Sequence, residues 1–133
     1  MEKLNTIQKR NNLNDVYRVD APGAGGACHN YLVVKTGSEA SEFCGGYYNF
    51  KKEDIVGAIS FQHGPRAEAS SVHGVLDTDL LEIVRDRLVA FNKGEFATRE
   101  NAIAITKIEE ALLWMNKRVE DRAERGVLGT TNK

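Results

Sequence analysis

The longest periodic segment of the chain runs from Thr98 to Thr130, TRENAIAITKIEEALLWMNKRVEDRAERGVLGT. Its apolar side chains recur at alternating intervals of three and four residues, the spacing of one helix face. They are Ile105, Ile108, Leu112, Met115 and Val119. Thr98 is a suitable N-cap and Gly126 is suited to end a helix. The segment therefore predicts one helix of about 27 residues, around which the rest of the chain is organised.

Polar side chains stand at both ends of this apolar stripe. At about 100° per residue, Asn101 and Arg122 fall within roughly 40° of the centre of the stripe, and Arg118 falls on its edge. A polar group that points at a core needs a hydrogen-bonding partner, or it lines a pocket. These three residues are therefore the first candidates for a binding site.

The length of the predicted helix separates these candidates. Asn101 and Arg118 are 17 residues apart, which is roughly 25 Å at 1.5 Å per residue. A ligand the size of a dinucleotide does not easily reach both residues in one chain. If both residues bind one ligand, the long helices of two protomers must run antiparallel, and a two-fold axis then creates two equal pockets.

Three arginines lie near the end of the predicted helix, beside Trp114: Arg118, Arg122 and Arg125. Guanidinium groups suit phosphate oxygens and stack on nucleobases. The alternative is a solvated face on which the arginines pair with Glu120, Asp121 and Glu124. The inward orientation of Arg122 weakens that alternative, but both interpretations stay open.

Other polar and aromatic positions also have two interpretations. Phe91, close to the turn before the long helix, suits either adenine stacking or an ordinary place in the core. The Asn101 amide suits a base edge or a ribose hydroxyl, or it satisfies the nearby helix start. The stretch GAGGACHN, with Gly25 and Gly26, lies between two predicted strands, so it fails the strand-to-helix context of a dinucleotide-binding loop. A hairpin loop is its main interpretation, and backbone amides facing a phosphate are the second.

The remainder of the chain predicts strands before helices. Residues 1–14 are polar, and strands are expected at 15–21, 29–36 and 42–50, with a central strand, sheltered on both faces, at 55–61. A first helix follows over 79–93 with Thr78 as its N-cap. We therefore expect an α+β fold of one domain, 1–133, with an N-terminal antiparallel β-sheet (15–73) and a C-terminal two-helix hairpin (76–126).

Composition excludes several classes of protein. The 133 residues carry 18 basic and 19 acidic side chains, so a nucleic-acid polymer is not an expected partner. No apolar run approaches the length of a membrane span, the first residues lack the apolar core of a signal peptide, and two cysteines fit a reducing cytoplasm. No nucleophile elbow, P-loop or HExxH motif is present, and no Cys or His pair has zinc-motif spacing. No catalytic residue, metal or cofactor is predicted.

Three stretches resemble a known family: FNKGEFATRENAIAITKIEEALLWMNKRVEDRAERGVLGT, PGAGGACHNY and FQHGPRAEAS. They are similar to small tailed-phage anti-defence proteins that share a C-terminal helical module, and most similar to the Thoeris anti-defence branch of the first type. The resemblance implies ligand pockets between protomers, with Phe91 stacked on an adenine, Asn101 nearby, and Arg118 and Arg122 on the phosphates and ribose. Arg125 is a supporting candidate. The resemblance also implies assembly into a homodimer. Whether the dimers associate further into hexamers stays open.

The function that the resemblance implies is sequestration. The chain is expected to bind a glyco-cyclic ADP-ribose messenger, made by host TIR-domain proteins, in the host cell cytoplasm without cleaving it, and so to block Thoeris immunity. One alternative is a sponge for the cyclic di- or trinucleotides of CBASS immunity, with Thr98 and Arg99 at the positive helix start contacting a second pocket. Another alternative is a non-catalytic structural or DNA-associated phage protein whose arginines are only solvated.

Overall fold

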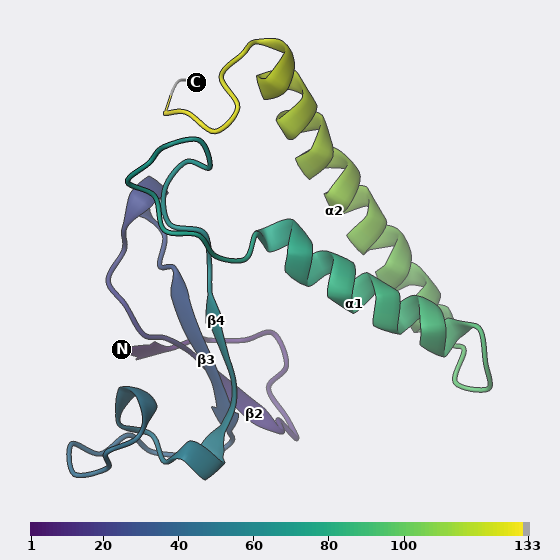
Figure 1. Ribbon diagram of the computed structural model, residues 1–133. Coiled ribbons are helices and arrows are strands. Elements are labelled where there is room, and N and C mark those ends of the chain that lie inside the picture. Colours follow the sequence, from purple (N-terminus) through teal and green to yellow (C-terminus); the bar gives the residue numbers. More distant parts are fainter. Residues whose placement is uncertain (132–133) are drawn as a thin grey trace. The chain divides into compact units, whose positions relative to one another are not determined.

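The computed structural model describes residues 1–131 and confirms the α+β class (Figure 1). The strands are β1 (Glu2–Lys3), β2 (Asn14–Arg18), β3 (Asn30–Lys35) and β4 (Ile55–Ser60), and the helices are α1 (Asp77–Asn92) and α2 (Arg99–Glu124). The chain divides into two compact units, Met1–His63 with the sheet and Gly64–Lys133 with the helices. No described helix is both long and apolar enough to cross a membrane.

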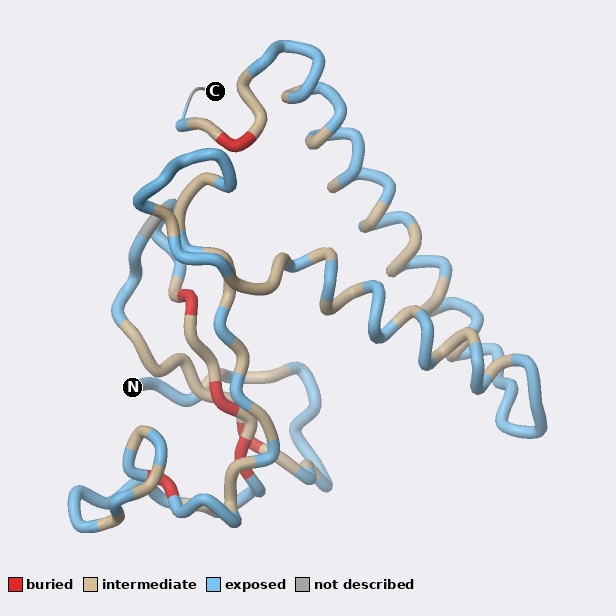
Figure 2. Tube along the Cα trace, in the orientation of Figure 1, coloured by how far each residue is buried: buried red, intermediate tan, exposed pale blue. Residues whose placement is uncertain are grey.

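The sheet is antiparallel throughout, in the order β1-β2-β3-β4. Its core consists of Leu32, Val34 and Phe50, each completely buried, and Tyr17 packs against Phe50 with the ring centroids 5.2 Å apart. Leu32 and Val34 are two residues apart in β3, so they lie on the same face of the sheet. Figure 2 shows most of the buried positions of the chain in this unit.

Two strand predictions differ from the structure. The predicted strand at 42–50 is wrong, because the segment turns through a 3-10 helix at Tyr47–Asn49 with left-handed φ values of 50° at Tyr48 and 66° at Asn49. This turn carries Phe50 into the core. The strand at 55–61 exists as β4, but it lies at the edge of the sheet, and alternate side chains such as Val56 are exposed. Small residues, Gly57 and Ala58, made the run look apolar on both faces.

The glycine-rich stretch is a loop between antiparallel β2 and β3, as its main interpretation predicted. Asp20 fixes its base: the carboxylate accepts hydrogen bonds from the backbone amides of His29 (3.0 Å) and Asn30 (3.1 Å). Burial by itself raises the pKa of Asp20, but these amide bonds outweigh it and hold that pKa below its ordinary 3.8. Inside the loop, Gly23 lies against the stacked imidazoles of His29 and His63, whose centroids are 4.2 Å apart.

The two helices form the predicted hairpin. Helix α1 starts after Leu76, not Thr78, because the Asp79 carboxylate accepts a hydrogen bond from the Leu76 amide at 2.9 Å. Helix α2 has the predicted N-cap, Thr98, and is followed by Gly126 with a φ of 70°. The helix has 26 residues, close to the expected length.

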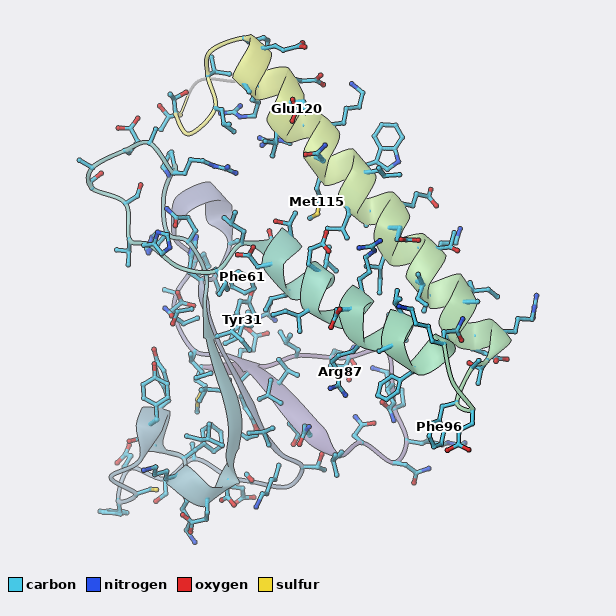
Figure 3. The ribbon with its side chains drawn as sticks, turned by 45° about the vertical axis from the view of Figure 1, so that its right-hand side comes forward. Tyr31, Phe61, Arg87, Phe96, Met115 and Glu120 are labelled. Atoms are coloured by element: carbon cyan, nitrogen blue, oxygen red, sulfur yellow. The ribbon has the colours of Figure 1, made fainter. Side chains whose placement is uncertain are left out.

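The helices diverge from the connection between them (Figure 1). Figure 3 shows Met115 of α2 pointing toward the α1 side. Across the hairpin, Arg85 donates from Nε (2.9 Å) and Nη2 (2.7 Å) to the Glu109 carboxylate. A cleft of about 730 Å³ lies between the helices, with Leu112, Leu113 and Val119 in its lining. No residue of either helix is buried within one chain, as Figure 2 shows. The apolar face of the hairpin is therefore only partly covered.

Candidate functional site

The aromatic candidate Phe91 lies in the last turn of α1 and is 42% exposed. The guanidinium carbon of Arg87, labelled in Figure 3, lies 5.4 Å from the centroid of its ring. This is a cation–π contact between residues one helical turn apart. Sequence reasoning missed Arg87, although the four-residue spacing to Phe91 was a sufficient signal. Such a ring can stack on a nucleobase, and the cation beside it can attract a phosphate of the same ligand.

The polar candidates at the start of α2 have different roles. The Thr98 hydroxyl accepts a hydrogen bond from the Asn101 amide nitrogen at 3.0 Å, so this hydroxyl caps the helix. The Thr98 backbone amide donates to the Asn92 side chain at 3.0 Å, which ties the connection to the end of α1. Arg99 is exposed. The side-chain amide of Asn101 is half-buried and makes no hydrogen bond within residues 1–131, so it can bind a ligand.

The arginine candidates lie in a groove of about 870 Å³ at the other end of α2, which we call the arginine groove. Its lining includes Trp114, Thr130 and Thr131, two acids and four cations, the cations being Lys117, Arg118, Arg122 and Arg125. The excess of cations gives the groove a positive character. The side chains of Trp114 and Arg118 are exposed, while Arg122 is half-buried, in agreement with its predicted inward orientation.

The acids of α2 do not neutralise the two principal arginines. Asp121 pairs instead with Lys117, with Nζ and Oδ2 2.9 Å apart. Across the described part of the chain, no carboxylate oxygen lies within 4.0 Å of Arg118 or Arg122. The alternative of an ion-paired surface therefore does not hold for these two side chains. Their charges can instead bind an anion.

Arg122 has a different kind of partner. Its Nη2 atom donates to two backbone carbonyls of the turn that follows α2, to Val127 at 3.0 Å and to Thr130 at 3.1 Å. A guanidinium group has five N–H donors, so three remain on Nε and Nη1. The same turn contributes Thr130 to the lining of the arginine groove. No pattern of residue types indicated this contact.

The candidates do not converge in one chain. Helix α2 is continuous from Arg99 to Glu124, so Asn101 remains about 25 Å along the axis from Arg118. Phe91 lies at the Asn101 end of the hairpin, because the connection between the helices is short. Gly25 and Gly26 belong to the other compact unit, where left-handed φ values of 73° and 79° shape the loop. The chain thus carries two separate groups of candidate residues, which we call half-sites, one with an aromatic ring and one with arginines.

The cysteines and histidines, whose side chains could bind a metal ion, are not part of these half-sites. Cys28 and Cys44 are free thiols. Within residues 1–131, no three His, Cys, Asp or Glu side chains are grouped as metal ligands. The two half-sites therefore consist of groups whose chemistry suits an anionic aromatic ligand, namely guanidinium groups, a side-chain amide and aromatic rings.

Known proteins match this chain across both half-sites. The family model described as Acb2/Tad1, hairpin domain, matches residues 53–120, just over half of the chain, and this range contains Phe91, Asn101 and Arg118. Thoeris anti-defense 1 of Bacillus phage SBSphiJ7 is 43% identical over 116 residues, which cover 80% of this chain and 81% of that protein. The expected resemblance is confirmed, and the chain belongs to the Acb2/Tad1 family.

Proposed function

We propose that this protein is a phage anti-defence sponge that sequesters a cyclic ADP-ribose messenger without cleaving it. The observation that carries this proposal is the arginine groove, where Arg118 and Arg122 have no acidic partner among the described residues. The name of the similar phage protein, Thoeris anti-defense 1, supports the anti-defence part of this proposal. In the host cytoplasm, removal of the messenger made by TIR-domain proteins would leave the Thoeris effector inactive.

The ligand chemistry matches the two half-sites. Two guanidinium groups suit the oxygens of a pyrophosphate, with charge-assisted hydrogen bonds that are stronger than neutral ones. Phe91 offers its ring to the adenine, and the free amide of Asn101 suits a base edge or a ribose hydroxyl. The acid of the groove that lies closest in sequence to both arginines, Asp121, is held by Lys117. We therefore assign binding roles and no catalytic role to these groups.

The pocket requires two chains. Because the half-sites lie at opposite ends of α2, one ligand can touch both only if the α2 helices of two protomers run antiparallel. The apolar surface left on the hairpin supports this arrangement: Leu113 is 71% exposed and Trp114 is 66% exposed in one chain. A second copy would cover part of that surface. We propose a homodimer as the binding unit, whether or not dimers associate further into hexamers.

A thermal-shift screen tests the proposal. Cyclic ADP-ribose isomers should raise the melting temperature of the wild-type protein, because a ligand that binds only the folded state stabilises it. Arg118→Ala should abolish the shift without lowering the melting temperature of the free protein, since Arg118 is exposed and makes no ion pair in the described residues. Lys107→Ala is the matched control, an exposed cation on the same helix that should keep the shift.

The same complexes distinguish a sponge from an enzyme. After heat denaturation, mass spectrometry of the released ligand should find it intact and in stoichiometric amount. Recovery of cleaved product would replace the sponge with a hydrolase. A wild-type protein that no nucleotide stabilises would support the structural or DNA-associated alternative.

A cyclic di- or trinucleotide of CBASS immunity is the second candidate ligand. The exposed Arg99 at the positive start of α2 favours it, because this position suits a phosphate. Competition calorimetry separates the two ligands. Simultaneous binding without displacement would indicate a second pocket that includes Arg99, while mutual displacement would indicate one shared pocket.

A further inference from the structure

The turn after α2, residues 127–130, is fixed from two sides. On one side, its Val127 and Thr130 carbonyls accept hydrogen bonds from Arg122 Nη2. On the other, the Gly129 carbonyl accepts a hydrogen bond of 2.9 Å from the Ala67 amide. The turn therefore links the arginine groove to the loop at residues 65–67.

Gly129 allows this double attachment. It is the buried residue of the turn, and its φ of 78° lies in the left-handed region. A Cβ atom at this position would lie 2.7 Å from the Ala67 Cβ and 2.8 Å from the Ala67 backbone nitrogen. Backbone atoms cannot yield as the end of a flexible side chain can, so any larger residue must push the turn away from Ala67.

The position of the turn determines the orientation of Arg122. The two carbonyls use the N–H groups of Nη2, which leaves the edge with Nε and Nη1 for a ligand. A guanidinium group binds phosphate well only when its planar fork is aligned with the oxygens. We propose that Gly129 is a positioning residue, which seats the 127–130 turn so that Arg122 presents its remaining donors to the anionic ligand. This inference rests on the proposed sponge function for its ligand.

Gly129→Ala tests the inference, with Gly126→Ala as the matched control. Gly126 also has a left-handed φ, 70°, but a Cβ there would meet no atom within 4 Å. Both variants carry backbone strain, and only Gly129→Ala displaces the turn. In titrations with cyclic ADP-ribose, Gly129→Ala should weaken binding by about tenfold or more, the scale of one hydrogen bond to a charged group, and Gly126→Ala should not. Equal losses in both variants would overturn the inference.

A double-mutant cycle separates positioning from general damage. If Gly129 acts through Arg122, Gly129→Ala should cause no further loss of cyclic ADP-ribose binding in an Arg122→Ala background. Independent, additive losses would overturn the proposed role of Gly129.

Two measurements on the unliganded protein keep the inference testable if cyclic ADP-ribose does not bind or if Gly129→Ala does not fold. The side-chain NMR signal of Arg122 should show restricted rotation of the guanidinium group in the wild type and free rotation in Gly129→Ala. Arg122→Lys should speed hydrogen exchange at the Ala67 amide, while Arg118→Lys should leave it unchanged. Free rotation in the wild type, or unchanged exchange in Arg122→Lys, would overturn the inference. Absence of nucleotide binding alone would overturn only the sponge function.

Discussion

Two inactive variants should restore a binding site when they are mixed. Phe91→Ala removes the aromatic half-site and Arg118→Ala removes part of the arginine half-site, and each homodimer then lacks a complete pocket. In a mixed dimer, Phe91 of one chain meets Arg118 of the other, so one pocket is complete while the second lacks both residues. This result follows from the separation of about 25 Å between the two ends of α2.

The expected recovery can be calculated. Random exchange of equal amounts gives about half mixed dimers, and each mixed dimer has one complete pocket of two, so about one quarter of the wild-type capacity returns. Phe91 is 42% exposed and Arg118 is exposed, so the substitutions should leave the fold intact. The restored pockets should bind with the wild-type Kd, because their contacts are unchanged.

Equilibrium dialysis with the cyclic ADP-ribose isomer that gives the largest thermal shift measures the capacity. The two variants are mixed under conditions in which subunits exchange, and mixed dimers are confirmed through two affinity tags. The unmixed variants supply the baseline. No recovery in confirmed mixed dimers would refute the two-chain pocket, since residues that act within one chain cannot complement each other.

Further predictions concern assembly and the sheet unit. Leu113→Glu should weaken dimerisation in sedimentation velocity by about 100-fold or more, because burial of a leucine is worth about 1.5–3 kcal/mol and the change occurs twice in a dimer. Leu13→Glu, which changes an exposed leucine of the sheet unit, should not weaken it. Asp20→Asn should lower the free energy of unfolding by about 1–2 kcal/mol at pH 7. The folded pKa of Asp20 is lowered, so its contribution is complete above the ordinary value of 3.8 and is lost as pH falls through the lowered value. The difference in unfolding free energy between wild type and variant should therefore shrink in urea titrations as the pH is lowered below 3.8. Gly23→Ala should destabilise the fold by about 1–3 kcal/mol in the same titrations, since its Cβ would lie 2.9 Å from His63 Nε2, while Gly45→Ala, with open space, should be neutral.

Local patterns predicted the helical unit well. The periodicity of α2 and the Thr98 cap involve residues within one or two turns of each other, so the sequence contains the whole signal. The half-buried orientation of Asn101 and Arg122 followed from the same periodicity. Their separation along the helix, on which the proposed two-chain pocket rests, also required no tertiary information.

The features that depend on long-range packing could not be predicted from the sequence. The 42–50 segment looks like a strand because it is rich in aromatic residues, but Phe50 is needed in the core and the chain must turn to deliver it. The length of an apolar run could not show that β4 is an edge strand. At the site, the partners of Arg122 are backbone carbonyls, which no pattern of residue types reveals. Even the Lys117–Asp121 pair, visible as a four-residue spacing, could not be told from the equally spaced Asp121–Arg125 pair.

If the proposed two-chain pocket exists, ligand binding and dimer formation must strengthen each other. Within one chain the hairpin buries no residue completely, and the ion pair between its helices, with side chains 41% and 42% exposed, contributes little to stability. A second copy would bury the apolar surface that the hairpin leaves exposed, and this dimer contact would also complete both pockets. If each pocket includes groups of both chains, free monomers bind the ligand weakly, and by thermodynamic reciprocity the ligand must tighten the dimer by the same factor. Sedimentation at nanomolar protein should therefore show dimers with cyclic ADP-ribose and dissociation into monomers without it. If a ligand binds tightly but leaves the dimer dissociation constant unchanged, the whole pocket lies in one chain.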